Sequence, residues 1–172
     1  KLAVTFFVVL IPLLSAEIFV LRSFSTSLRE ASELELTNIV NHLYRLIEVH
    51  QHPDEDSAGQ PIPTPKDVES LSEVIKTFRV GMTGYPYVMD SKGTLVIHPR
   101  QSGENILEAR DSKGFAFIKE ICDQAVGLEA GRTGTIHYPW KNQDERGDPR
   151  MKILKFRYFP EWDWIIAAGS YE

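Results

Sequence analysis

Residues 84–99 read GYPYVMDSKGTLVIHP, and residues 158–171 read YFPEWDWIIAAGSY. In both stretches, residues that favour strands are bounded by Gly, Pro and Asp, which favour turns, so each stretch predicts short antiparallel strands. Residues 134–140 (GTIHYPW) and residues 151–159 have the same character. The sequence therefore predicts an antiparallel sheet of five strands, at residues 84–89, 94–98, 134–140, 151–159 and 164–168.

Helical periodicity flanks these strands. Between residues 25 and 51, apolar residues recur at spacings of three and four, which predicts one long helix. Thr64 and Pro65 are typical of the start of a second helix, and the apolar spacing at residues 115–125 predicts a third that covers one side of the sheet. The fold class is therefore α+β, with a long N-terminal helix and flanking helices. The charged face of the long helix is a candidate homodimer interface.

The N-terminal segment is apolar. Residues 2–21 contain few polar side chains, and a stretch of about 20 such residues is long enough to cross a bilayer. We expect a transmembrane helix, or its outer part, over residues 1–22 and an extracytoplasmic domain over residues 23–172. A cleaved signal peptide is the alternative, although the helical pattern continues past Glu17 without a break. The chain begins at Lys1 rather than at a methionine, as a fragment would.

Length, charge and cysteine content limit the class of protein. The 172 residues suffice for one domain with a core and an appended helix. The net charge is −5, and Lys and Arg are scattered along the sequence, so we expect no nucleic-acid partner. The single cysteine, Cys122, excludes an internal disulfide and is expected to be a small buried hydrophobe.

Five segments in a fixed order carry a family resemblance: residues 79–99 (RVGMTGYPYVMDSKGTLVIHP), Gly103 with residues 105–107, residues 111–114, residues 134–140, and residues 152–171 (KILKFRYFPEWDWIIAAGSY). Over roughly residues 36–171, the sequence resembles the single Cache domains of the second class, which are PAS-like modules of bacterial membrane receptors. The resemblance implies a periplasmic sensor domain at the inner membrane, in a methyl-accepting chemotaxis protein or a sensor histidine kinase. It implies binding of a small molecule, with short carboxylates such as acetate, propionate, pyruvate or lactate as the expected ligands.

Strand alternation identifies the face that would bind such a ligand. Side chains two apart share a face, so Val96 and His98 are expected to face one way, and Leu95 and Ile97 the other. The same rule places Ile136, Tyr138 and Trp140 on one face of their strand. The aromatic face then gathers five candidate ligand-binding residues with hydrogen-bond donors: Tyr85, Tyr87, His98, Tyr138 and Trp140.

A carboxylate ligand also needs positive charge, because charge-assisted hydrogen bonds offset its desolvation. Arg79, at the junction of the second helix and the first strand, is one candidate. Lys152 is the other, since it matches the lysine that opens the fourth strand of the family pattern. The chain departs from that pattern at Lys155, where the family more often has an aromatic residue, and a second lysine there is expected to tune or displace the anion site.

Several of these residues have structural alternatives. Aromatic residues in sheets commonly pack in the core, which is the role expected of Trp162 and Trp164. His98 is a structural hydrogen-bonding group, a ligand contact or a pH-sensitive element. His50 and His52 lie beside acidic residues, but in a proline-rich loop without fixed geometry, so no metal or cofactor site is predicted.

The sequence leaves two other functional classes open. No nucleophile elbow, phosphate-binding glycine loop or zinc-binding helix motif is present, so an enzyme is not expected. A membrane-anchored hydrolase would have to use His98 with Asp90. A structural or adhesion module would have a filled interior in place of a ligand pocket.

Overall fold

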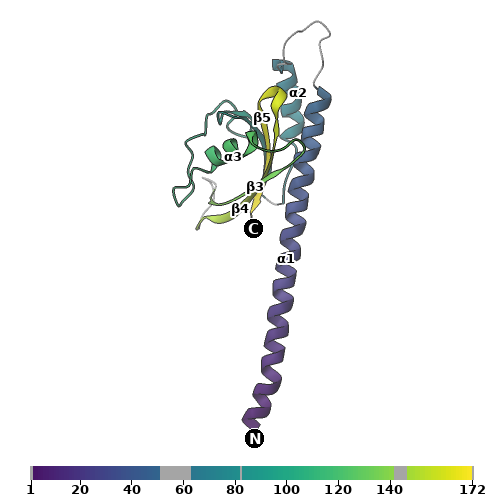
Figure 1. Ribbon diagram of the computed structural model, residues 1–172, viewed down its shortest axis with the longest axis vertical. Coiled ribbons are helices and arrows are strands. Elements are labelled where there is room, and N and C mark those ends of the chain that lie inside the picture. The colour runs from purple at the N-terminus through teal and green to yellow at the C-terminus, as the bar shows by residue number, and fades with distance from the viewer. Residues whose placement is uncertain (1, 51–62, 82, 142–146, 172) are drawn as a thin grey trace. The chain divides into compact units, whose positions relative to one another are not determined.

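The computed structural model describes residues 2–50, 63–81, 83–141 and 147–171, with side chains from residue 17 onward (Figure 1). The chain divides into two compact units, Lys1–Leu34 and Glu35–Glu172. The first unit belongs to helix α1 (Leu2–His50). The predicted membrane segment, residues 1–22, lies mostly where side chains are not described. Within the described residues, no helix has both the length and the apolar character that a membrane crossing requires.

The second unit contains the predicted sheet. In the described part of the chain, five antiparallel strands follow the order β2-β1-β5-β4-β3. Four of these strands begin and end within about one residue of the predicted bounds, whereas β5 continues to Tyr171, beyond its predicted end at residue 168. The strands are β1 (Tyr85–Asp90), β2 (Leu95–Ile97), β3 (Gly134–Trp140), β4 (Arg150–Phe159) and β5 (Trp164–Tyr171).

A separate core covers each face of the sheet. On one face, α1 and α2 (Pro65–Ile75) contribute buried residues such as Leu43 and Leu71, which pack with Val88 and Ile166. On the other face, α3 (Phe117–Val126) packs against side chains of β1, β3, β4 and β5. The prediction of an α+β fold with a long helix and flanking helices is confirmed.

Helix α2 begins as the sequence predicts. The Thr64 side chain accepts a hydrogen bond from the Asp67 backbone N–H at 3.2 Å, and the Asp67 carboxylate accepts one from the Thr64 backbone N–H at 2.9 Å. Pro65 occupies the first turn, where its missing N–H group is not needed. This reciprocal pair satisfies two backbone groups that a helix N-terminus otherwise leaves without a partner.

Strand β2 contains a bulge that strict alternation does not predict. Val88 pairs with Ile97 and Met89 pairs with Leu95, so the register shifts by one residue at Val96. Leu95 packs in the α3-side core, whereas Ile97 packs with α1 and α2. The prediction that Leu95 and Ile97 share a face, with Val96 and His98 on the other, was wrong because the extra residue reverses the alternation.

The connection from β4 to β5 is a tight turn that closes over the α1-side core. The 3₁₀ helix η1 (Pro160–Trp162) is followed by Asp163, whose φ of 53° lies in the left-handed region. The Asp163 carboxylate accepts hydrogen bonds from Tyr158 Oη at 2.9 Å and Ser91 Oγ at 2.8 Å. The turn buries Trp162 and Trp164, which confirms their predicted role in the core.

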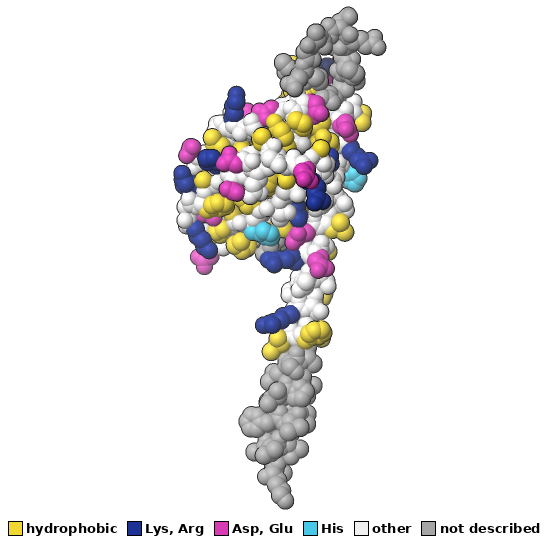
Figure 2. Space-filling view, viewed as in Figure 1, with side chains coloured by type: hydrophobic (Ala, Val, Ile, Leu, Met, Phe, Trp, Pro, Cys, Tyr) yellow, Lys and Arg dark blue, Asp and Glu magenta, His cyan; other side chains and the backbone are white. Residues whose placement is uncertain are grey.

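Charged side chains of both signs are interspersed on the visible face of the second unit (Figure 2). On that face, Lys and Arg side chains are not gathered into one basic patch. A nucleic-acid partner would require a concentrated positive surface, so this face offers no electrostatic footprint for one.

Candidate ligand-binding site

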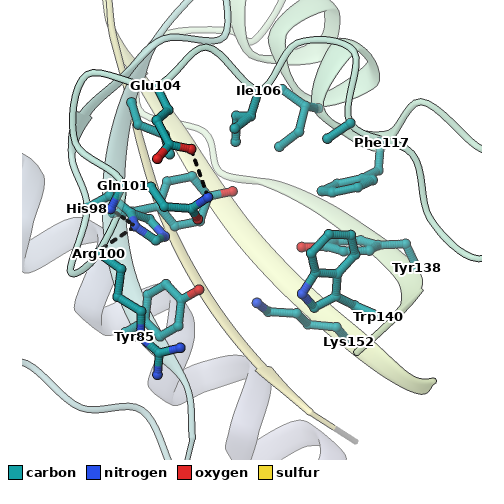
Figure 3. Close-up of a pocket in the computed structure, with 14 residues that line it drawn as sticks. Tyr85, His98, Arg100, Gln101, Glu104, Ile106, Phe117, Tyr138, Trp140 and Lys152 are labelled. Carbon is teal, nitrogen blue, oxygen red and sulfur yellow. Dashed lines mark hydrogen bonds between the residues drawn. The ribbon is translucent and has the colours of Figure 1, made fainter. Parts of the chain in front are cut away.

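A cavity of about 530 Å³, partly open to solvent, lies between the α3-side face of the sheet and the segment at residues 98–109 (Figure 3). The filled interior that a structural module would have is therefore not found at this face. The structure brings six of the seven residues predicted for the site to this cavity: Tyr85, Tyr87, His98, Tyr138, Trp140 and Lys152.

Lys152 is the buried cation of the cavity. Its side chain extends from β4, and the residue is only 6% exposed. The Nζ atom lies 5.3 Å from the ring centroid of Tyr85 and 5.6 Å from that of Tyr171, within the range of cation–π interactions. Figure 3 shows the ammonium group directed towards the open space between Tyr85 and Trp140. An anion in that space would therefore lie next to a positive charge.

His98 is held as a neutral hydrogen-bond donor. Its Nδ1 atom accepts hydrogen bonds from the backbone N–H groups of Arg100 at 3.2 Å and Gln101 at 3.0 Å. Burial, followed by the charges of Lys152, Arg100 and Lys76, lowers the pKa of His98 from 6.5 to about 4. Since Nδ1 accepts, Nε2 carries the hydrogen of the neutral ring. The imidazole thus shapes the turn after β2 and retains one N–H donor.

An aromatic wall opposite His98 joins β3 to α3. The Tyr138 ring stacks on Phe117 with centroids 4.2 Å apart and planes 15° apart, and Trp140 meets Phe117 edge-on at 5.2 Å. Burial raises the pKa of both Tyr138 and Tyr87, so their hydroxyl groups stay protonated at neutral pH. The wall therefore combines apolar ring surface with neutral donors. The predicted alignment of Ile136, Tyr138 and Trp140 agrees with their shared core cluster.

Sequence reasoning missed the residues that the segment after β2 contributes. This segment is tied to β2 by hydrogen bonds from the Leu95 N–H to the Glu104 carbonyl at 2.9 Å and from the Gly103 N–H to the Leu95 carbonyl at 2.7 Å. Gln101 Nε2 donates to Glu104 Oε2 at 2.9 Å. An irregular segment has no periodicity from which its side-chain directions can be predicted. The family resemblance at residues 103–107 was the one sequence feature that could have drawn attention to it. The additional lining residues are Arg100, Gln101, Glu104, Ile106 and Ala109, with Leu95, Phe117 and Ile118 from β2 and α3.

The structure does not bring Arg79 to the cavity. Its Nη1 atom donates to the carbonyl oxygens of Lys76 at 2.9 Å and Phe78 at 3.2 Å, just after α2 ends. A cation at this position complements the negative end of the helix dipole. Arg79 is therefore a helix-terminating residue in this structure, and it does not share a site with Lys152.

Lys155 also lies apart from the cavity. Its Nζ atom donates to Thr135 Oγ1 at 2.8 Å, across the β3–β4 pair. Because Lys152 and Lys155 are three residues apart on one strand, their side chains leave opposite faces of the sheet. The expectation that Lys155 tunes or displaces the anion site is thus not supported by its placement.

His98 and Asp90, the pair that a hydrolase would use, are each held by hydrogen bonds to nearby backbone groups. Asp90 Oδ1 accepts hydrogen bonds from the backbone N–H groups of Lys92 and Thr94, at 3.0 and 2.7 Å, while His98 Nδ1 faces backbone N–H groups of its own turn. Burial raises the pKa of the Cys122 thiol to about 11. Among the described residues, no group of three or more His, Cys, Asp or Glu is placed to hold a metal. Residues 51–56 of the proline-rich loop lie outside the described residues.

Comparison with known proteins places this geometry in a family. Residues 62–172 match the family model of the Cache 3/Cache 2 fusion domain. The sensor histidine kinase MctS of Rhizobium johnstonii (strain DSM 114642 / LMG 32736 / 3841) is 28% identical over 147 residues, which cover 83% of this chain and 29% of MctS. The chain therefore spans less than a third of the length of this curated relative.

Solved structures share the fold. A periplasmic sensor domain of a chemotaxis protein superposes with a TM-score of 0.65 at 21% identity, covering 85% of this chain and 96% of that one. A Cache chemosensory domain solved for its carboxylic acid recognition has a TM-score of 0.67 at 19% identity, with 85% and 97% covered. A methyl-accepting chemotaxis protein from Vibrio parahaemolyticus RIMD 2210633 has a TM-score of 0.63 at 23% identity, with 85% and 92% covered.

The family match covers more than half of the chain and includes the whole sheet. The predicted resemblance to a single Cache domain is thereby confirmed, and the module is a sensor rather than an enzyme. The chain belongs to the Cache 3/Cache 2 fusion domain family of ligand-binding sensor modules.

Proposed function

We propose that the chain is the periplasmic sensor domain of a bacterial membrane receptor, either a chemoreceptor or a sensor histidine kinase. Family membership supports ligand sensing, and the similarity to MctS and to the Vibrio chemotaxis protein supports these two outputs. The membrane helix at residues 1–22 is part of this proposal. The homodimer through α1 stays a prediction, to be checked by light scattering of the purified chain.

We further propose that the cavity binds a small carboxylate, and the observation that carries this proposal is the buried Lys152. The Lys152 ammonium group is buried and directed towards the cavity, so a carboxylate beside Nζ would form a charge-assisted hydrogen bond there. Tyr85 and Trp140 direct their polar atoms towards the same space, and His98 adds an Nε2–H donor. The carboxylic acid recognition reported for one structural neighbour supports the same ligand class.

A ligand panel tests this proposal on the purified 172-residue chain. We expect at least one of acetate, propionate, pyruvate and lactate to raise the melting temperature in a saturable way, because a ligand that binds only the folded state stabilises it by mass action. Amines, neutral sugars and amino acids form the comparison set. A panel in which no compound binds would contradict direct ligand sensing, and recovery of a chemically altered ligand would point to an enzyme.

Two lysines of β4 provide a matched pair of variants. Lys152→Met should weaken carboxylate binding by at least tenfold, since a hydrogen bond to a charged group contributes about 1.5–3 kcal/mol. Lys155→Met removes an equal charge on the opposite face of the same strand, and its affinity for the carboxylate should match that of the unmodified chain. Calorimetric titration measures both. Equal losses of affinity in the two variants would mean that only the net charge of the protein matters, and would refute the proposed anion site at Lys152.

A further inference from the structure

We propose that the preferred ligand is a monocarboxylate with an apolar body larger than that of the two- to four-carbon acids. This inference rests on the proposed carboxylate binding at Lys152 and extends it to the rest of the ligand. It follows from the division of the cavity into a polar end and an apolar end.

The two ends are built by different elements. At the polar end, the polar atoms of Tyr85, Trp140 and Lys152 point towards one another across the cavity (Figure 3). Ile106 and Phe117 lie across the cavity from Lys152. Three further hydrocarbon side chains line this end of the cavity: Leu95 from β2, Ala109 from the segment after β2, and Ile118 from α3.

The apolar end is preformed. Phe117 is only 4% exposed and is fixed by its stacking on Tyr138, with ring centroids 4.2 Å apart. Leu95 and Ile118 are each 1% exposed, so they are packed against the rest of the core. The segment that carries Ile106 and Ala109 is held by hydrogen bonds from the Ile106 N–H to the Gly93 carbonyl and from the Ala109 N–H to the Ile106 carbonyl, both 2.9 Å. These packed side chains hold the apolar end in place, and the half-buried Ile106 and Ala109 supply the surface that a ligand tail would contact.

The size of the cavity exceeds what a short acid fills. If each non-hydrogen atom displaces about 30 Å³, as a water molecule does in the liquid, then the four atoms of acetate occupy on the order of 100 Å³. The cavity measures about 530 Å³, which falls in the range of pockets that hold considerably larger ligands. An acid bound by its carboxylate at Lys152 thus leaves the apolar end to its tail or to water.

Glu104 favours a single carboxylate over two. Its side chain lies across the cavity from Lys152, on the side where Ile106 lies, and its Oε2 atom accepts the Gln101 side-chain N–H at 2.9 Å. A second carboxylate at the far end of a ligand would meet this negative charge and would lose water among hydrocarbon side chains. The arrangement therefore selects an apolar tail rather than a second anionic group.

Calorimetric titration with a series of acids tests the inference on the purified 172-residue chain. From acetate through propionate and butanoate to hexanoate, affinity should rise by about fourfold for each added methylene that is buried. We expect hexanoate to bind at least tenfold more tightly than propionate. Adipate, with the same six carbons and a second carboxylate, should bind at least tenfold more weakly than hexanoate.

Variants at the apolar end separate tail binding from carboxylate binding. Ala109→Leu places extra volume in the tail region and should weaken hexanoate binding at least fivefold more than it weakens propionate binding. Ile106→Ala removes apolar contact without adding volume, so it should also weaken the binding of hexanoate more than that of propionate. This second variant tests the inference if Ala109→Leu does not fold. Circular dichroism melts verify folding of each variant.

The outcomes distinguish this inference from the proposed function. If propionate and hexanoate bind equally, and Lys152→Met weakens both, the larger ligand is refuted while carboxylate sensing stands. If none of the acids binds, or if Lys152→Met binds all of them as the unmodified chain does, carboxylate binding itself is refuted. A rise in affinity with chain length that disappears in Ala109→Leu supports the inference.

Discussion

Two lysines of β4 show how position within a strand decides the role of a charge. Lys152 faces the cavity and is buried beneath aromatic rings, whereas Lys155 leaves the other face and donates to Thr135. An ammonium group in a partly enclosed cavity interacts more strongly with an anion than an ammonium group in bulk water, because the effective dielectric constant is lower. The same residue type therefore has a candidate binding role at one position and a local structural role at the other.

His98 links the cavity to the stability of the fold. Its Nδ1 atom holds the backbone of the turn after β2, so protonation of that atom would break hydrogen bonds from Arg100 and Gln101. The ring also lies edge-on to Tyr85 and Tyr87, at centroid distances of 5.2 and 5.9 Å. Charging this histidine is therefore unfavourable in the folded state.

The pKa of His98 predicts how stability depends on pH. The unfolded chain takes up this proton near pH 6.5, whereas the folded chain takes it up at about pH 4. The contribution of His98 is therefore complete above about pH 6.5 and is lost as the pH falls towards 4. We expect a loss on the order of 2 kcal/mol in the free energy of unfolding, since water in the open cavity screens part of the charge.

His98→Asn is the variant that tests this dependence. The Asn side-chain oxygen can accept the same backbone N–H groups, but it does not titrate. Urea unfolding between pH 4 and pH 7.5 should show a shallower fall in stability for the variant than for the unmodified chain. Parallel curves for the two proteins would show that other groups produce the pH dependence.

The bulge in β2 determines which side chains of that strand reach the cavity. One extra residue at Val96 places Leu95 and His98 on the cavity side, with Ile97 between them on the α1 side. The segment that follows can then fold back over the sheet, where its backbone pairs with Leu95. Bulges commonly redirect side chains next to functional sites, and this one supplies two of the lining residues.

Helix α2 offers a test of the fold that should leave the cavity unaffected. Thr64→Ala removes the side-chain oxygen that caps the helix and should lower the free energy of unfolding by about 1 kcal/mol. Because α2 packs on the face of the sheet opposite to α3, carboxylate affinity should not change. Thr64→Ser keeps the capping oxygen and should retain most of the stability. A loss of affinity in Thr64→Ala would mean that the two faces are coupled.

The second unit is organised as two cores that share one sheet. Leu43 is completely buried on the α1 side, and Phe156 is completely buried on the α3 side, while adjacent strands supply residues to both. Neither core has a sheet of its own. We therefore expect the unit Glu35–Glu172 to unfold as a single cooperative structure.

Core variants on the two sides test this cooperativity. Leu43→Ala should lower the free energy of unfolding by about 2–5 kcal/mol and Phe156→Ala by about 3–5 kcal/mol, through lost burial and cavity formation. In each variant, tryptophan fluorescence and circular dichroism should report one coincident transition in urea. Two separate transitions, with only one moved by each substitution, would show that the cores unfold independently.

Local sequence signals predicted much of the architecture. The period of two along β3 identified Tyr138 and Trp140 as sharing a face, and the Thr64–Pro65 pair identified the start of α2. These predictions succeed because side-chain alternation and helix capping depend on backbone geometry within a few residues. The ordered family segments added the identity of the domain, which residues 62–172 confirm.

Other features depended on contacts between distant segments. Strict alternation failed at β2 because the pairing of Leu95 and Ile97 with β1 creates the bulge, and Arg79 satisfies carbonyl groups after α2 instead of approaching Lys152. The lining residues at 100–109 come from an irregular segment whose position is set by its hydrogen bonds to β2.

The sequence by itself thus determined the elements, the α+β class, the family and six side chains of the cavity. Only the tertiary structure decided that an apolar end and Glu104 lie across the cavity from Lys152. The physical reason is that periodicity describes which face of an element a side chain occupies. The distance between two side chains on different elements depends on strand register and packing, which no local pattern specifies.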